Sequence, residues 1–154
     1  LTRSLPQVAR YKLGGYQQAL EEAGIPYDPT LVYEGKVDYD SGIELARKLC
    51  NENKDVTAVV ATADILAIGA MKGFYEQGVS VPNDISIVGF DDLEISKYLT
   101  PGLTTVRQEI SQKGEKAVEL LLDNIQDADM TKREVIIPVS LSRRESVRDM
   151  RGEE

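Results

Sequence analysis

The chain has 154 residues, of which 42% are hydrophobic and 29% charged, the balance of an ordinary globular domain with a sizeable core. No apolar run approaches the ~20 residues that cross a bilayer, and no signal-peptide pattern is visible. The net charge of -8 repels phosphate backbones, so this chain should not bind DNA or RNA by itself. It has no histidine and one cysteine, Cys50, which excludes histidine-based triads, Cys/His zinc sites and an intrachain disulfide.

Helical patterns and apolar strand patterns alternate along the first hundred residues. Apolar residues at helical spacing are followed by Gly24 and Pro26, which end the first helix. The expected elements are a helix over 7–23, a strand over 31–34, a helix from Asp40 or Ser41 to about Asn53, a strand over 57–62, a helix over 65–77 and a strand over 85–89. This alternation with short links predicts an α/β fold with a doubly wound, mostly parallel sheet.

The pattern changes after Pro101. We expect a strand over 103–108, a helix over 110–126, a polar loop and a strand over 135–141. The chain starts at Leu1 with a helix, whereas an α/β unit normally begins with the strand that feeds its first helix. We therefore expect an incomplete sheet, the later part of a larger fold.

Carboxylates follow three of the expected strands, at 37–40, at Ala63-Asp64 and at Asp91-Asp92. In open α/β sheets, ligands bind outside the carboxyl ends of the strands, and carboxylates suit polyhydroxylated ligands. We interpret Asp91 as a ligand-binding residue and Asp92 as a residue of the local turn. Asp64 is either a helix cap or a second ligand-binding residue.

Catalytic and metal-binding readings of the same acids are weaker. Adjacent residues such as Asp91 and Asp92 rarely point into one cleft at the ~5–9 Å separation of a glycosidase pair. No further carboxylates are spaced as in a calcium loop, and Gly14-Gly15 lacks the third glycine of a dinucleotide fingerprint. The sequence predicts neither an enzyme nor a metal or cofactor site.

The expected helix over 65–77 carries apolar residues on more than one face, which indicates either full burial or a subunit interface. Tyr98 and Leu99 extend the apolar surface beside it. We expect a homodimer interface formed by Leu66, Ile68, Met71, Tyr98 and Leu99.

Several motifs, in order and at matching spacing, resemble one family over essentially the whole chain. They are ARYKLGGYQQAL, ATADILAIGAMKGFYEQG, VPNDISIVGFDDLEISKYLTPGLTTVRQ and IIPVSLSRRESV. The chain thereby resembles the LacI/GalR family of bacterial transcription regulators. The resemblance implies a periplasmic-binding-protein-like core (type I) of two α/β subdomains, with a small-molecule effector in the cleft between them.

The same resemblance implies how the chain divides. Residues 1–102 would belong to the C-terminal effector-binding subdomain. Residues 103–132 would cross into the N-terminal subdomain, and residues 133–154 would form the return strand and tail. On this resemblance, the helix-turn-helix headpiece and most of the N-terminal subdomain would lie outside this chain.

Effector roles carry over at several positions. Asp91 matches the family's cleft aspartate, and Lys12 falls where sugar-binding members often have an arginine, with Arg10 one helical step away. Asp64 matches the second residue of an Asn-Asp pair whose asparagine is Ala63 here. Val37 aligns with an effector-stacking aromatic. A sugar, or a phosphorylated or acidic ligand that reaches Lys12 and Arg10, is the expected effector class.

The predicted function is therefore the effector-binding and dimerisation core of a cytoplasmic LacI-type regulator that contacts operator DNA only through its headpiece. The alternative is a sugar-binding protein of a transport system, which the missing export signal disfavours.

Overall fold

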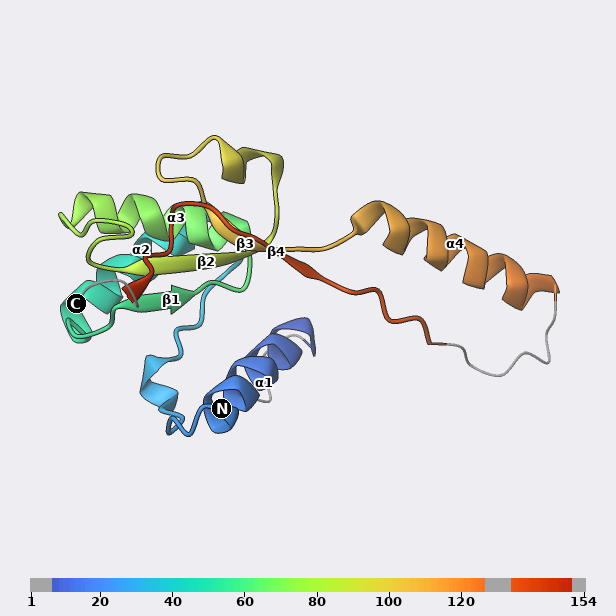
Figure 1. Cartoon of the computed structure of the whole chain (residues 1–154), viewed down its shortest axis with the longest axis horizontal. Helices are drawn as coiled ribbons and strands as arrows, with labels where there is room; N and C mark the ends of the chain where they lie inside the picture. The colour runs from blue at the N-terminus through green and yellow to red at the C-terminus, as the bar shows by residue number, and fades with distance from the viewer. Residues whose placement is uncertain (1–6, 127–133, 151–154) are drawn as a thin grey trace.

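Four strands form one sheet in the computed structural model, which describes residues 7–126 and 134–150 (Figure 1). The strand order is β1-β2-β3-β4, with parallel pairing from β1 to β3 and antiparallel pairing between β3 and β4. In chain order the elements are α1 (Gln7–Glu22), η2 (Pro29–Leu31), α2 (Tyr39–Glu52), β1 (Ala58–Val60), α3 (Asp64–Glu76), β2 (Ser86–Asp91), η3 (Glu94–Lys97), β3 (Thr104–Arg107), α4 (Ile110–Gln126) and β4 (Ser140–Ser142). The predicted α/β class with a mostly parallel, open sheet is confirmed.

The core lies where α3 and α2 cover the sheet. Phe74 of α3, Ile87 of β2 and Leu103 are fully or almost fully buried. Burial of one such side chain contributes about 1.5–3 kcal/mol. The buried cluster consists of Ala46, Ala67, Ala70, Phe74, Ile85, Ile87 and Leu103. None of the described helices is both long and apolar enough to span a membrane.

The backbones of α2 and α3 are in close contact at two glycines. A Cβ atom on Gly42 would collide with the carbonyl oxygen of Leu66, and one on Gly69 with the carbonyl oxygen of Tyr39. Any other residue at these positions would force the helices apart. This packing fixes α3, and with it the Ala63-Asp64 corner at the carboxyl end of β1.

The first strand expected from the sequence, 31–34, is wrong. The Asp28 side chain accepts a hydrogen bond from the Thr30 N–H (2.8 Å), which favours the 3-10 turn that Pro29 begins. Residues 32–37 follow as irregular chain without a strand partner in the described part of the molecule. The cap expected at Asp40 or Ser41 is also wrong, because Asp38 accepts from the Ser41 N–H (2.7 Å) and α2 begins at Tyr39.

The last expected strand, 135–141, is largely wrong as well. Only Ser140–Ser142 pairs with β3, in the register Arg107↔Ser140. β3 ends at Arg107, so residues before Ser140 have no neighbouring strand, and Pro138 has no N–H to donate. The segment between α4 and β4 is therefore irregular where it is described.

Ser146 joins β2 to the start of β3. Its Oγ donates to the Ile87 carbonyl (2.6 Å) and accepts from the Thr104 N–H (2.8 Å). Its backbone N–H donates to the Gly102 carbonyl, while the Ile87 N–H donates to the Ser146 carbonyl. Ser146 is fully buried, so the segment after β4 completes the sheet.

α4 projects away from the sheet at the end of two crossing segments, one leading out from β3 and one returning to β4 (Figure 1). Most of its large apolar residues are exposed, as are most of those in the returning segment. They are Ile110, Val118, Leu121, Leu122, Ile125, Val135, Ile136, Val139 and Leu141.

Candidate functional site

The chain bends sharply where β2 ends. Asp91, the last residue of β2, has φ 122°, and Asp92 has φ 55°. Both values lie in the region that non-glycine residues rarely adopt. Conformations of this kind persist only where surrounding contacts hold them, and they concentrate at functional sites. Contacts of Asp64, Asp92 and Asp91 supply that support here.

Asp64 is a fully buried carboxylate beneath the bend. Its Oδ2 accepts from the Leu93 N–H (2.8 Å) and the Ser96 hydroxyl (2.6 Å), and its Oδ1 accepts from the Thr105 hydroxyl. The carboxylate therefore ties α3, β3 and the loop after Asp92 together. The cap role expected for Asp64 is wrong: Ala63 is the N-cap, without a side-chain hydrogen bond.

Gly89 of β2 makes room for this carboxylate. A Cβ atom at Gly89 would overlap Oδ1 of Asp64 and press on the Leu103 side chain. The glycine in the strand ISIVGF thus serves close packing of an acid against the sheet.

Asp92 binds the returning segment. Its two oxygens accept from the Arg144 guanidinium (2.6 Å) and the Ser142 hydroxyl (2.9 Å), and Arg144 also donates to the Leu103 carbonyl (2.7 Å). Burial raises the pKa of Asp92, but the hydrogen bonds and the charge of Arg144 outweigh it, so this pKa lies below its ordinary value of 3.8. Asp92 thus lies in the expected local turn, and its side chain also joins that turn to residues about fifty positions further along the chain.

Asp91 binds the outgoing segment but keeps one free acceptor. Its Oδ1 accepts from the amide of Gln108 (2.8 Å), which lies between β3 and α4. Its Oδ2 has no hydrogen-bond partner within residues 7–126 and 134–150. A half-buried carboxylate with one unoccupied oxygen at the carboxyl end of a parallel sheet can accept a ligand hydroxyl.

Lys12 brings α1 to the same end of the sheet. Its ammonium donates to the Thr62 carbonyl (2.8 Å) and lies 3.6 Å from the centre of the Phe90 ring. Burial and the nearby charge of Lys113 lower the pKa of Lys12, while the charge of Asp91 opposes this shift. The ammonium groups of Lys12 and Lys113 and the carboxylate of Asp91 therefore share one electrostatic neighbourhood.

The other residues expected to bind the effector differ widely in solvent exposure. Arg10 is exposed on α1, and Val37 is 62% exposed just before α2. Ala63 is only 6% exposed, and Asp64 has none of its surface exposed. Asp64 therefore supports the site from beneath.

Three partners of the adjacent acids Asp91 and Asp92 escaped sequence reasoning: Gln108, Ser142 and Arg144. A signal for Gln108 exists, since Asp91 pairs with Arg107 in the sheet and the next residue must lie beside the bend. Ser142 and Arg144 follow only from the antiparallel return of β4.

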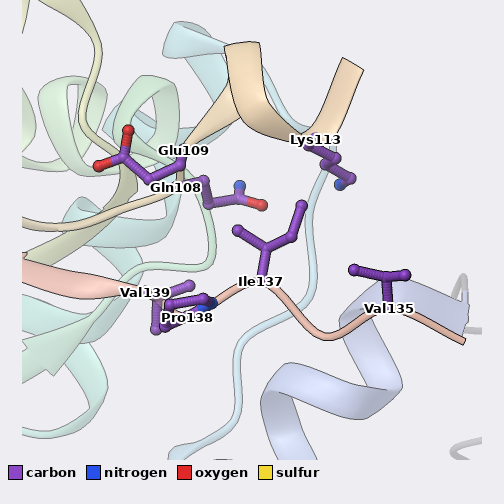
Figure 2. A pocket seen from close by; sticks show the side chains of 7 residues that line it. All are labelled: Gln108, Glu109, Lys113, Val135, Ile137, Pro138 and Val139. Carbon is purple, nitrogen blue, oxygen red and sulfur yellow. The ribbon is translucent and has the colours of Figure 1, made fainter. Parts of the chain in front are cut away.

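A pocket of about 160 Å³ lies between the two crossing segments, next to Gln108 (Figure 2). The Gln108 amide points into it toward Ile137 and Lys113, whereas the Glu109 carboxylate points away. Its lining residues are Gln108, Glu109, Lys113, Val135, Ile137, Pro138 and Val139.

A second, larger hollow of about 600 Å³ includes three residues of the expected dimer interface, Ile68, Met71 and Leu99. Leu66 is half-buried, and Tyr98 is 67% exposed. Three of the five expected interface residues therefore line one surface depression.

Metal-ligating side chains do not gather in the described part of the chain. No group of three or more His, Cys, Asp or Glu side chains is placed there to hold a metal ion. Burial raises the pKa of the Cys50 thiol, which keeps it protonated.

Comparison with known proteins identifies relatives. The family model described as "periplasmic binding protein-like domain" matches residues 3–147. The HTH-type transcriptional regulator MalR of Clostridium butyricum is 40% identical over 139 residues, which is 90% of this chain and 41% of that protein.

Two solved structures share the fold. A LacI family transcriptional regulator from Enterococcus faecium with bound ribose superposes with a TM-score of 0.79 at 32% identity, over 88% of this chain and 50% of that one. The transcriptional regulator CelR in complex with cellobiose gives 0.83 at 35% identity, over 87% of this chain and 41% of that one. The chain thus spans about two fifths to one half of the proteins that it matches.

Proposed function

This chain belongs to the periplasmic binding protein-like domain family, and we propose that it forms the effector-binding and dimerisation core of a LacI-type transcriptional regulator. The resemblance to LacI-type regulators is confirmed by the LacI family regulator from Enterococcus faecium, which matches 88% of this chain, and by the transcriptional regulator MalR, which matches 90%. Because these relatives are named as regulators, they favour a regulator over a sugar-binding protein of a transport system and over an enzyme.

The observation that carries the proposal is the carboxylate of Asp91. Its backbone bend is held by Asp64 and Asp92, and its Oδ2 is unoccupied in the described part of the chain. Such an acceptor suits a hydroxyl-bearing ligand, and Lys12 beside it suits one that also carries negative charge. Sugars and phosphosugars are therefore the proposed effectors, and Lys12, Arg10, Ala63 and Val37 are proposed as further effector-binding residues.

The exposed apolar residues of α4 and of the returning segment support the proposed division into subdomains. Exposed apolar surfaces of this extent mark interaction sites. We assign residues 1–102 to the C-terminal subdomain, 103–132 to a segment that crosses to an N-terminal subdomain, and 133–154 to the return. The second half of the effector cleft would then come from a subdomain outside this chain.

In the proposed mechanism, the effector binds two subdomain arrangements with different affinities and so shifts their populations. That shift changes the spacing of the helix-turn-helix headpieces on operator DNA in the cytoplasm. The net charge of -8 supports a DNA contact that lies entirely outside this chain.

Replacing Asp91 by alanine is expected to abolish effector binding without unfolding the protein, because the side chain is half-buried and makes one hydrogen bond. A thermal-shift screen of the full-length regulator with D-ribose, cellobiose and glucose 6-phosphate selects the ligand, and calorimetry then measures its affinity for the Asp91→Ala variant. Asp55→Ala, at an exposed acid in a turn before β1, is the matched control. Unchanged affinity in Asp91→Ala would refute the assigned site.

Dimerisation is proposed through the apolar depression around Ile68 and Leu99. The double variant Ile68→Asp, Leu99→Asp is expected to be monomeric by light scattering, because two buried charges at an interface cost several kcal/mol. Tyr98→Asp, at an exposed residue, weakens the dimer without touching the core. Val8→Asp with Tyr11→Asp on α1 should leave the mass unchanged, and a dimeric mass for the first two variants would count against this interface.

A further inference from the structure

We infer that Asp64 and Ser96 are positioning residues for dimerisation, because their hydrogen bond fixes the two walls of the larger surface depression relative to each other. The inference rests on the proposed dimer through that depression, and it names two residues that no partner copy can touch. Neither Asp64 nor Ser96 exposes any of its surface. Their effect on a partner copy is therefore transmitted through the residues that follow them.

Separate parts of the chain form the depression of about 600 Å³. Ile68 and Tyr75 line it from α3, residues 78–81 line it from the loop after α3, and Leu99 and Pro101 line it from the segment between η3 and β3. A surface composed of separate segments fits a partner without loss of affinity only if those segments already hold their relative position.

Asp64 joins α3 to the η3 segment. It is the first residue of α3, about one helical turn before Ile68. Its Oδ2 accepts from the Ser96 hydroxyl (2.6 Å), and Ser96 lies in η3, three residues before Leu99. The same oxygen accepts from the Leu93 N–H (2.8 Å), just before η3. In the described part of the chain, no further side-chain hydrogen bond joins α3 to this segment.

Ser96 anchors a segment that has few other buried groups. Its neighbours Ile95 and Tyr98 are 47% and 67% exposed. The Ser96 carbonyl accepts from the Leu103 N–H (2.9 Å), which holds the segment to the start of β3. A segment with so few buried contacts belongs to the less stable parts of a fold. Loss of the Ser96 hydroxyl therefore loosens one wall of the depression and leaves every residue that lines it unchanged.

The other oxygen of Asp64 provides a matched control. Oδ1 accepts from the Thr105 hydroxyl of β3. Thr105 is held independently by the sheet, where it pairs with Gly89 on one side and with Ser142 on the other. Thr105→Val therefore removes a buried donor to the same carboxylate and leaves the strand in place. A purely structural role of Asp64 would make the loss of either donor equivalent for dimerisation.

Sedimentation equilibrium of the full-length regulator measures the dimer dissociation constant. Ser96→Ala should raise it about tenfold: if the segment keeps its position in about a third of the subunits, affinity falls by the square of that fraction, because both copies contribute the same wall. Thr105→Val should stay within about twofold of the wild type. Equal dissociation constants for Ser96→Ala and Thr105→Val would overturn the inference.

Hydrogen–deuterium exchange tests the segment itself. The N–H groups of Ser96 and Tyr98 donate to the carbonyls of Leu93 and Ile95. Amides of residues 96–98 should exchange about fivefold faster in Ser96→Ala and at the wild-type rate in Thr105→Val. Wild-type exchange in Ser96→Ala would contradict the anchoring role, whatever the state of association.

The interface variant Ile68→Asp, Leu99→Asp separates this inference from the proposal on which it rests. A monomeric mass for that variant, together with an unchanged dimer constant in Ser96→Ala, would overturn the positioning role and leave the interface standing. A dimeric mass for the interface variant would overturn both.

Discussion

Asp64→Ala is expected to lower the free energy of unfolding by about 3 kcal/mol or more, because it leaves two buried donors and one partly buried donor without an acceptor. The donors are the Leu93 N–H and the hydroxyls of Ser96 and Thr105. The change also leaves a void beside Gly89, and Gly89 has no side chain that could fill it. A loss of this size is a large part of the ~5–15 kcal/mol that holds a typical domain folded.

Urea unfolding followed by circular dichroism measures the loss. Because Asp64→Ala is expected to be close to unfolding, two milder variants keep the prediction testable. Asp64→Asn retains one acceptor and should lie between the wild type and alanine, and Thr105→Val removes one donor at a cost of about 1 kcal/mol. Stabilities of all three within about 0.5 kcal/mol of the wild type would show that Asp64 does not support the bend.

Arg144→Met is expected to cost about 2–3 kcal/mol, because it leaves the Asp92 carboxylate buried without its cation. The Asp92 side chain is 10% exposed and the Arg144 side chain 19%, so solvent can replace little of the lost contact. Arg143→Met, at the exposed neighbouring residue, is the matched control and should be close to neutral. A wild-type stability in Arg144→Met would contradict the role of this pair in fastening the return.

The same pair predicts a dependence on pH. The pKa of folded Asp92 lies below 3.8, so its stabilising contribution is fully present above the unfolded pKa and is lost as pH falls through the folded pKa. The wild type should therefore lose stability below about pH 4, and Arg144→Met should lose less over that range because it lacks the ion pair. Parallel acid profiles for the two proteins would rule out this contribution.

Much of the fold was predictable because helical and strand patterns alternate regularly along the chain. The apolar runs around Val59 and Ile87 and the helical spacing of 7–22 and 110–126 match the observed elements closely. The absence of strands over 31–34 and over most of 135–141 was not predictable. A strand forms only where a neighbouring strand provides hydrogen-bond partners for its backbone. Local apolar content carries no information about where a neighbouring strand ends.

The candidate site was predictable in part for a related reason. The position of Asp91 and Asp64 at strand ends follows from the order of the elements. The different contacts of the acids do not follow from that order. They depend on Thr105, Gln108 and Arg144, which lie beside the acids only because of the sheet register and the antiparallel return of β4. The expected effector roles of Lys12 and Val37 stay predictions.

The buried hydroxyl of Ser146 has a consequence for synthesis. Its partners Ile87 and Thr104 precede it by 59 and 42 residues. A nascent chain can pack α2 against α3 early, because these helices are neighbours in sequence. Closing the long loops to Ser146 costs chain entropy, and only the contacts of the completed sheet offset that cost. The C-terminal end of the sheet therefore forms only after the return segment has left the ribosome, and until then the edges of β2 and β3 are the surfaces that a chaperone would have to shield.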